Sequence, residues 1–484
     1  MTESWVNSAE RIGADLHLEL SGPGGRRAAL TRALREAVRS GRLAPGTRLP
    51  PYRSLAADLG VARNTVADAY AELVAEGWLT ARQGSGTRVA MGLPSTPSGQ
   101  SGRRKPPRQA VRTPVKTPPR AHGPRHDLRQ GAPDASSFPR TAWSASYRRA
   151  LQAAPSEAFG PGDPAERREL REALTEYLAR ARGVRTEPDR IVVCSGFAHA
   201  LRLLFGEGTG GVLRGPLGVE AYGLDFHRGL LATAGVRTVP LPLDEHGARV
   251  EVLGRERAVL LTPAHQFPTG GPLHPERRAA VIDWARARGA VVLEDDYDGE
   301  FRYDRRPVGA LQGLDPERVI YIGSVSKSLS PALRLGWMVL PERYVGPVLA
   351  AKGEREAWAS VPDQLALADF VVSGSYDRHV RRMRQRYRGR RDRLVAAFAA
   401  HAPHIEVTGI AAGLHAVLRL PPGTERSTVK AATWQGVGLD GLAAFRHPQS
   451  PTTAGEGLVV GYAAAAEHTY EAALEALCGV LPPE

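Results

Sequence analysis

Residues 92–126 form a stretch that cannot pack into a domain of its own, and they divide the chain in two. Eight of these 35 residues are proline, eight are lysine or arginine, and none is acidic or aromatic. So little apolar surface cannot offset the entropy lost on ordering, and Pro-Pro pairs and charge repulsion keep such a segment extended. The sequence therefore predicts a flexible linker between a small N-terminal domain, residues 14–91, and a large C-terminal region, residues 127–484.

Composition excludes several classes of protein. The 484 residues include no apolar run of about 18, the length that a membrane span requires, and the N-terminus lacks the pattern of a signal peptide. The two cysteines are too few for a disulfide framework or a cysteine-rich zinc site, so we expect a cytoplasmic protein without a metal site. The net charge is +13, with its excess concentrated in the linker. Such a run is either a solvated tether or a region attracted to phosphates.

The small N-terminal domain has the spacing of a helix-turn-helix. Apolar residues recur at helical intervals over residues 26–39 and 54–59, and Gly60 allows a tight turn before a further helix that Asn64 is expected to cap. Residues 81–90 then predict two short strands around glycines, which form a wing. Three small packed helices with no role in DNA binding have the same pattern, so the spacing alone leaves both interpretations open.

In a helix-turn-helix, the first turn of the second helix enters the major groove of DNA and reads base edges or contacts the backbone. An arginine on the preceding helix can reach a phosphate or a base. Glycines in a wing allow close approach to the minor groove or to the backbone. The candidate DNA-contacting residues are Arg53, Arg63, Asn64, Thr65, Arg82, Gly84, Ser85, Gly86 and Thr87.

Three motifs stand in a fixed order in this domain. They are G-x-L-x-P-G-x-R-L-P, R-x-L-A-x-x-L-G-V-x-R-N-T-V and G-x-G-T. In this combination the domain resembles the winged helix-turn-helix of the GntR family of transcriptional regulators. The resemblance implies that it binds double-stranded operator DNA.

In the C-terminal region, short apolar strands alternate with helices. Strands are expected over residues 191–194, 258–262, 290–293 and 319–323, and a helix that starts with proline and stops at a glycine is expected over residues 275–288. This alternation predicts an α/β fold whose mostly parallel sheet is covered by helices on both faces.

Ligand-binding groups in such sheets gather at the carboxyl ends of the strands, where Ser195, Gly196, Asp295, Tyr297 and Lys327 all fall. A desolvated lysine can form a Schiff base with an aldehyde, a carboxylate can pair with a protonated ring nitrogen, and a phenol can donate to a ring oxygen. Hydroxyls, N–H groups at a helix start and an arginine can hold a phosphate. Together these groups predict pyridoxal 5′-phosphate, although a lone lysine is usually a solvated surface charge and the acids could simply end a strand in water.

The C-terminal region closely resembles the aminotransferase-like domain of MocR-type regulators in TPAHQFPTGGPL, VVLEDDYDGEFRYDRRP and VIYIGSVSKSLSPALRLGWMVLP. The resemblance implies a fold-type-I aminotransferase-like fold, with a large domain to about residue 345 and a small domain after it. It implies Lys327 as the Schiff-base lysine, Asp295 as partner of the pyridine nitrogen and Tyr297 as donor to the ring oxygen. The residues implied for the phosphate are Ser324, Ser326 and Arg334, with the backbone of Ser195, Gly196 and Phe197.

The resemblance also implies a head-to-tail homodimer whose effector is a B6 vitamer or a small amine. The cofactor, or its adduct with an amine, would change the closure of the large domain, and the linker would relay that change to the winged domains. The predicted function is therefore that of a ligand-sensing transcriptional regulator. A working aminotransferase with an attached DNA-binding domain is the alternative, and a relative that has lost the cofactor is a third interpretation.

The chain departs from this family at three points. The aromatic residue that relatives place over the cofactor ring aligns with Leu224, with Tyr222 as a substitute two residues away, and Pro161 replaces a tyrosine on the phosphate side. The arginine that clamps a substrate carboxylate has no counterpart in GEGLVVGY, for which Arg446 is the nearest candidate. Because transamination needs a tightly oriented amino acid, the missing clamp favours a regulator.

An arginine-rich run over residues 376–393 offers a second potential contact with nucleic acid. However, Val380, Met383, Tyr387 and Leu394 recur on one helical face. The run therefore predicts an amphipathic helix with a solvated basic side rather than a DNA-binding surface.

Overall fold

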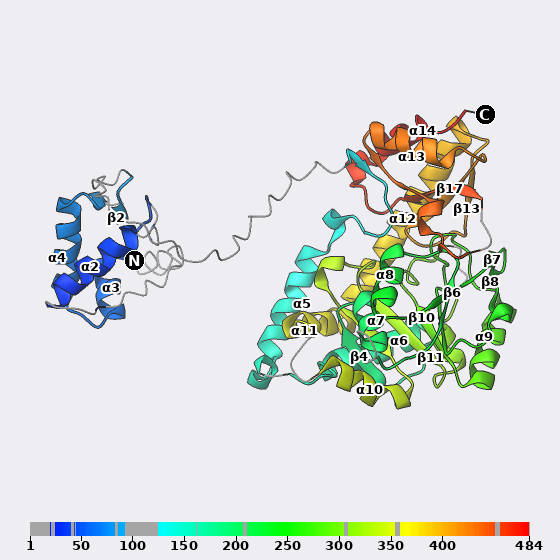
Figure 1. The fold of residues 1–484 in the computed structure, drawn as a ribbon, viewed down its shortest axis with the longest axis horizontal. Coiled ribbons are helices and arrows are strands. Elements are labelled where there is room, and N and C mark those ends of the chain that lie inside the picture. The colour runs from blue at the N-terminus through cyan, green and yellow to red at the C-terminus, as the bar shows by residue number, and fades with distance from the viewer. Residues whose placement is uncertain are drawn as a thin grey trace, which may run out of the picture. The chain divides into compact units, whose positions relative to one another are not determined.

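The computed structural model describes residues 20, 25–39, 43, 45–82, 86–91, 124–160, 162–206, 211–303, 308–353, 359–450 and 455–483. The chain divides into two compact units, residues 1–115 and 116–484, whose elements are labelled in Figure 1. Residues 92–123 of the predicted linker lie outside the described residues, so the linker stays a prediction.

The described residues of the first unit form three helices and a hairpin. They are α2 (Arg26–Arg39), α3 (Tyr52–Asp58), α4 (Arg63–Ala75), β1 (Leu79–Arg82) and β2 (Gly86–Val89). The two strands pair antiparallel, with Leu79 opposite Val89. One core cluster joins α2 through Leu30 and Leu34 to α4 through Val66 and Leu73. The predicted helix-turn-helix with its wing is confirmed, because the apolar positions at helical spacing are the ones that form this core.

The start of α4 differs from the sequence prediction. Asn64 is not its cap: the helix begins at Arg63, its N-cap is Ala62, and no side chain caps it. The backbone N–H of Thr65 instead bonds to the carbonyl of Ala62 at 3.0 Å, which closes the first turn. The capping prediction is therefore wrong, and Asn64 lies exposed in the first turn of the helix.

A seven-stranded sheet forms the centre of the second unit (Figure 1), in the order β4-β12-β11-β10-β9-β5-β6. Its strands are β4 (Ile191–Cys194), β5 (Leu217–Glu220), β6 (Thr238–Leu241), β9 (Ala258–Leu261), β10 (Val291–Asp295), β11 (Val319–Ser324) and β12 (Gly336–Val339). Only β12 runs antiparallel to its neighbours. The predicted mostly parallel sheet is confirmed.

Helices cover both faces of this sheet, because successive residues of a strand point to opposite sides. Val193 belongs to a core cluster with α5, α6 and α11, whereas its neighbours Val192 and Cys194 belong to a cluster with α7, α8 and α10. A further cluster packs α9 against the sheet. These helices are α5 (Arg140–Ala153), α6 (Arg168–Arg182), α7 (Phe197–Phe205), α8 (Asp225–Thr233), α9 (Pro275–Arg288), α10 (Glu342–Lys352) and α11 (Val361–Val372).

A smaller domain lies at one end of this unit (Figure 1) around an antiparallel sheet of order β13-β14-β17-β16. Its elements are α12 (Ser375–His401), β13 (Glu406–Thr408), β14 (His415–Leu420), α13 (Glu425–Trp434), β16 (Asp440–Gly441), β17 (Glu456–Gly461) and α14 (Tyr470–Cys478), with β3 (His126–Asp127) paired to β15 (Val437–Gly438). A separate two-stranded sheet joins β7 (Leu243–Asp244) to β8 (Gly247–Ala248).

The boundary between the core of the large sheet and the core of the small sheet falls within α12. Tyr376 and Val380 belong to the core of the large sheet, whereas Met383 and Tyr387 belong to the core of the small one. Residues well beyond 345, the boundary that the sequence suggests, thus belong to the core of the large domain, because α11 packs against α5 and α6 and Tyr376 at the start of α12 packs against Tyr177 of α6.

The arginine-rich helix α12 is largely a structural element. Its four predicted apolar residues are buried, as expected. Arg390, however, is fully buried, and its guanidinium lies 2.9 Å from the Glu467 carboxylate while also donating to two backbone carbonyls. Arg386 and Arg393 pair with the same carboxylate. The predicted solvated basic side is confirmed by exposed arginines such as Arg388. It is wrong for Arg390, because spacing along a helix does not reveal a carboxylate contributed from 77 residues away.

No helix in the described ranges combines the length and the apolar character needed to cross a membrane. No group of three or more His, Cys, Asp or Glu side chains in those ranges is placed to hold a metal ion.

Candidate functional site

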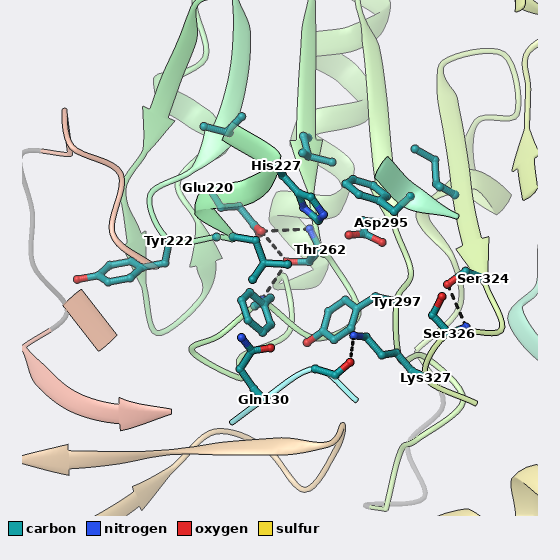
Figure 2. Close-up of a pocket in the computed structure, with 18 of the residues that line it drawn as sticks. Gln130, Glu220, Tyr222, His227, Thr262, Asp295, Tyr297, Ser324, Ser326 and Lys327 are labelled. Atoms are coloured by element: carbon teal, nitrogen blue, oxygen red, sulfur yellow. Dashed lines mark hydrogen bonds between the residues drawn. The ribbon is translucent and has the colours of Figure 1, made fainter. Parts of the chain in front are cut away.

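A cavity of about 200 Å³ lies at the carboxyl ends of the central strands of the second unit. Strands β5, β9, β10 and β11 end at its wall, because parallel strands finish at the same edge of a sheet. Figure 2 shows their polar side chains converging there. Six residues that the sequence assigned to the cofactor line this cavity: Phe197, Asp295, Tyr297, Ser324, Ser326 and Lys327.

Lys327 follows β11 and points into the cavity (Figure 2). Its Nζ donates a hydrogen bond to the carbonyl of Gly131, which adopts a φ of +112° that suits glycine. Burial lowers the pKa of Lys327 below its ordinary 10.5, although Asp295 and Asp298 oppose the shift. The amine therefore loses its proton more readily than a surface lysine does, as a nucleophilic lysine requires.

Asp295 is the last residue of β10 and lines the same cavity. Burial raises its pKa well above the usual range, and Asp296 adds to the shift while Lys327 opposes it. Asp296 is itself neutralised by Arg182, whose Nε lies 2.6 Å from its carboxylate. Among the described residues no cation lies within ion-pair distance of Asp295, so this carboxyl is poised to receive a cationic partner from a ligand.

Tyr297 lies two residues beyond β10, and its hydroxyl is 2.9 Å from Nδ1 of His265. The same nitrogen lies 2.8 Å from the carboxylate of Asp298. Burial raises the pKa of Tyr297 well above its usual value, and Asp298 and Asp295 add to the shift. The phenol therefore keeps its proton and can act as a hydrogen-bond donor.

The predicted phosphate site is built on the start of α7 and the loop after β11. Gly196, the N-cap of α7, has a φ of +95°, which only glycine adopts easily. The first turn of α7 presents backbone N–H groups, which attract anions. Beside the cavity the backbone N–H of Ser326 donates to Oγ of Ser324 at 3.4 Å.

Three of the predicted phosphate residues do not line the cavity. The N–H of Ser195 donates to Nδ1 of His199 at 3.0 Å, and Gly196 contributes only the helix start described above. Arg334 is exposed and has a φ of +53°. Pro161 lies outside the described residues.

Glu220 is a half-buried acid at the cavity wall that sequence analysis missed. At the end of β5, its Oε2 accepts from the N–H and the hydroxyl of Thr262, at 3.2 and 2.5 Å, and from the Gln266 amide at 3.3 Å. Its Oε1 makes no hydrogen bond, and no cation pairs with it, within the described part of the chain. Burial raises the pKa of Glu220 to about 7. Its place at a strand end was the signal that could have identified it.

The structure also locates the residues at which the chain departs from its relatives. Leu224 lines the cavity as expected but contributes no ring. The Tyr222 ring points away from Lys327 (Figure 2) and packs in a cluster with Val417 and Phe445. Tyr222 is therefore poorly placed to replace the missing ring, because small-domain side chains hold it elsewhere.

The described lining of the cavity has no arginine that is available to pair with the carboxylate of a substrate. Arg446 is exposed and does not line it. Besides Lys327, the arginine among the described lining residues is Arg228, whose Nη1 donates to the carbonyls of Gly223 and Phe445 at 2.7 and 3.0 Å. Burial lowers the pKa of Arg228. In β17, the strand of GEGLVVGY, Val459 is fully buried, so a carboxylate clamp is absent there.

On the first unit, the predicted DNA-contacting residues lie around the start of α4. Arg53, Arg63 and Asn64 are exposed and Thr65 is half-buried. Gly86 is exposed, but Thr87 is only 6% exposed, so the outward residue of β2 is its neighbour Arg88, whose Nη1 bonds to the Gly46 carbonyl. The Arg82 side chain, Gly84 and Ser85 lie outside the described residues.

Comparison with known families accounts for both units. The family described as bacterial regulatory proteins, gntR family, matches residues 27–89, and the family aminotransferase class I and II matches residues 127–477. The probable rhizopine catabolism regulatory protein MocR of Rhizobium meliloti is 33% identical, over 90% of this chain and 89% of its own length. The pyridoxine biosynthesis transcriptional regulator PdxR of Corynebacterium glutamicum is 32% identical, over 91% and 92%.

The chain belongs to the GntR-type transcriptional regulators that carry an aminotransferase domain. The family predicted from the motifs is thereby confirmed, and the protein is a DNA-binding regulator. The kynurenine aminotransferase of Pyrococcus horikoshii shares the fold of the second unit, with a TM-score of 0.65 and 24% identity over 73% of this chain and 90% of that one.

The cofactor that this aminotransferase fold implies is pyridoxal 5′-phosphate. The residues present fit that molecule on their own chemistry. The cavity holds a lysine whose pKa is lowered and a carboxyl whose pKa is raised by burial, without a counter-ion for the carboxyl among the described residues, and a helix start and serine hydroxyls border it.

Proposed function

We propose that this regulator binds pyridoxal 5′-phosphate in the cavity of its second unit, and that the state of this cavity sets its affinity for operator DNA. The observation that carries the proposal is that Lys327 and Asp295 open into one cavity with pKa values displaced by burial in opposite directions. Strongly perturbed groups in a shared cleft are characteristic of functional sites.

Each residue of the cavity has a distinct part in holding the cofactor. When bound, pyridoxal 5′-phosphate supplies an aldehyde that condenses with amines and a pyridine ring that withdraws electrons. Lys327 offers the uncharged amine, Asp295 pairs with the ring nitrogen and holds a proton there, and Tyr297 donates to the ring oxygen. Ser324 and Ser326, with the first turn of α7, receive the phosphate.

The effector that fits this cavity is the B6 vitamer itself or an amine without a carboxylate. The guanidinium of Arg228 already bonds to two backbone carbonyls, so an amino acid finds no arginine prepared for its carboxylate among the described lining residues. The unbonded Oε1 of Glu220, by contrast, can accept from an ammonium group. An ammonium placed there would lower the pKa of Glu220 again by favouring its charged form.

We propose further that the protein acts as a homodimer on a pair of operator half-sites. Helix-turn-helix dimers place two recognition helices in successive major grooves, so the half-sites are separated by about 10 base pairs or a multiple. In this arrangement α4 enters the groove, with Arg63 and Asn64 as the first residues to reach base edges. The head-to-tail packing and the cytoplasmic location remain predictions; sedimentation with and without DNA tests the dimer.

Coupling between cavity and operator needs a ligand that binds the two states of the protein unequally. The test is a titration of DNA from the protein's own promoter region, followed by fluorescence anisotropy, with pyridoxal 5′-phosphate alone and together with amines. DNA affinity is expected to change with the ligand in the natural protein and not in Lys327→Ala. If the DNA affinity of both proteins were the same with and without the ligand, the proposal would be overturned.

A working aminotransferase is the second candidate, because Lys327, Asp295 and Tyr297 are all in place at the cavity. The missing carboxylate clamp argues against it, since productive transfer needs a tightly held amino acid. Complete turnover of an amino donor with a keto acid, measured by product formation, would establish the enzyme; its absence leaves the regulator.

A further inference from the structure

Two aromatic rings meet at the cavity wall where α7 and α8 begin. The centroids of Phe197 and His227 lie 4.7 Å apart with their planes inclined by 47°. Both side chains line the cavity that also contains Lys327 and Asp295, and Figure 2 shows the imidazole of His227 directed into it. This pair is therefore a preformed aromatic surface at the site proposed for the cofactor.

The imidazole of His227 is a neutral, flat surface. Burial, with help from Lys327 and Arg228, lowers its pKa to about 4, so it carries no charge near neutral pH. Neither ring nitrogen makes a hydrogen bond within the described part of the chain. A neutral ring with no polar partner there is a suitable face for another aromatic ring.

The other rings at the cavity already pack against protein groups. Phe267 packs edge-on against Tyr297, His415 and Phe445, with centroids 5.2 to 5.8 Å apart. His415 is buried and bonds to the Pro268 carbonyl at 3.0 Å.

Neither Tyr222 nor Leu224 places an aromatic ring where relatives stack one on the cofactor. Tyr222 is held in the small-domain cluster, and Leu224, at the place where relatives carry an aromatic residue, has no ring. His227 lies one turn of α8 after Leu224, so both belong to the same end of that helix.

We propose that His227 is the positioning residue that stacks on the cofactor's pyridine ring in this chain, and that Phe197 holds the imidazole in place. The inference rests on the proposed binding of pyridoxal 5′-phosphate. Relatives stack an aromatic ring from the position of Leu224, whereas this chain stacks the imidazole of His227 from the next helical turn. The imidazole thus replaces the ring that is missing at Leu224. His227 acts on the orientation of the cofactor and not on its attachment to Lys327.

The test compares His227→Ala with His227→Phe and with the matched control His401→Ala, a change at an exposed residue at the end of α12. Each protein is titrated with pyridoxal 5′-phosphate, following the absorbance and the visible circular dichroism of the bound cofactor. Stacked aromatic pairs differ from unstacked ones by roughly 2- to 13-fold in affinity. We expect a loss of affinity in this range and a changed dichroism for His227→Ala. His227→Phe should keep the affinity and dichroism of the natural protein, and His401→Ala should leave both unchanged.

A double variant separates stacking from a general packing defect. Leu224→Tyr is expected to restore both affinity and dichroism in the His227→Ala background, and thermal unfolding of the cofactor-free proteins shows whether each variant folds. Equal affinity and dichroism in the natural protein and His227→Ala would overturn the inference while leaving the proposed function intact. If the natural protein bound no cofactor, the proposed function itself would fail.

Discussion

The surface predicted to contact DNA on the first unit and the cavity of the second are built in opposite ways. The predicted surface comes mainly from one short stretch, in which Arg53, Arg63 and Asn64 are exposed. The cavity collects side chains from segments as distant as Gln130 and His415 and encloses them. Charges on the first are screened by water and salt, whereas burial displaces the pKa values of groups in the second.

This difference determines how each region responds to change. Removing a side chain from the surface removes one of several interactions with DNA, and the effect depends on salt. Removing a buried group from the cavity leaves its partner without compensation in a medium of low polarity, which costs far more. Five experiments test this contrast.

The largest effect is expected from Lys327→Ala. Because the lysine amine is the point of attachment, borohydride reduction followed by peptide mass mapping should find the cofactor fixed on Lys327 in the natural protein and nowhere in the variant. Lys430→Ala, on helix α13, serves as the control and should leave the labelling unchanged. An unmodified Lys327 in the natural protein would contradict the cofactor assignment.

Asp295→Asn should weaken the binding of the cofactor without abolishing its attachment to Lys327. Hydrogen bonds to charged groups contribute about 1.5–3 kcal/mol, which corresponds to roughly 13- to 160-fold in affinity. Titration with pyridoxal 5′-phosphate measures this loss, and Asp283→Asn on helix α9 provides a matched control. An unchanged affinity would show that Asp295 does not pair with the ring nitrogen.

Arg63→Ala tests the surface by the same logic. A side chain that reads a base is expected to contribute about 1–3 kcal/mol to a specific site and to relax preference at one position. Anisotropy titrations with operator variants measure both, and Arg32→Ala, exposed on α2, is the control. A uniform loss on all sequences would instead make Arg63 a phosphate-binding residue.

The pH dependence of cofactor attachment should reflect the environment of Lys327. Burial penalises the charged amine, so its pKa lies below 10.5, and the reactive neutral form is present at lower pH than on a surface lysine. Borohydride trapping measured against pH should therefore have its midpoint below 10.5. Asp295→Asn should move it lower still, since Asp295 opposes the shift; a rise would contradict this balance.

The smallest effect is expected from the linker. Replacing Arg103, Arg104, Lys105 and Arg108 with glutamine should reduce the affinity for all DNA sequences alike. The slope of the logarithm of the binding constant against the logarithm of the salt concentration should also become shallower. The expected change is up to about 0.9 for each DNA phosphate that the linker no longer neutralises. The control is a linker in which the three arginines become lysine. It keeps the charge, so its DNA affinity and salt dependence should equal those of the natural protein. Weakening confined to the operator would show that the segment reads sequence.

Much of the fold followed from local pattern. β4 was predicted with its observed bounds, and α9 was predicted from its first proline to its terminal glycine, Gly289, which is left-handed in the structure. Lys327 and Asp295 were placed together because strand ends in a parallel sheet share one edge, and their roles came from the resemblance of the surrounding motifs. By contrast, Asn64 was wrongly predicted to cap α4, and the burial of Thr87 was not foreseen, since both depend on neighbours in space.

The sequence by itself determined the division into two parts, the alternation of strands and helices in the second part, and three candidate residues of its cavity, Lys327, Asp295 and Tyr297. These properties are encoded in spacing and composition over a few residues. Only the tertiary structure decided that Arg390 is buried, that Glu220 faces the cavity with one oxygen unbonded among the described residues, and that His227 rather than Tyr222 presents a ring to it. Such facts depend on which distant segments surround a side chain, and no local periodicity carries that information.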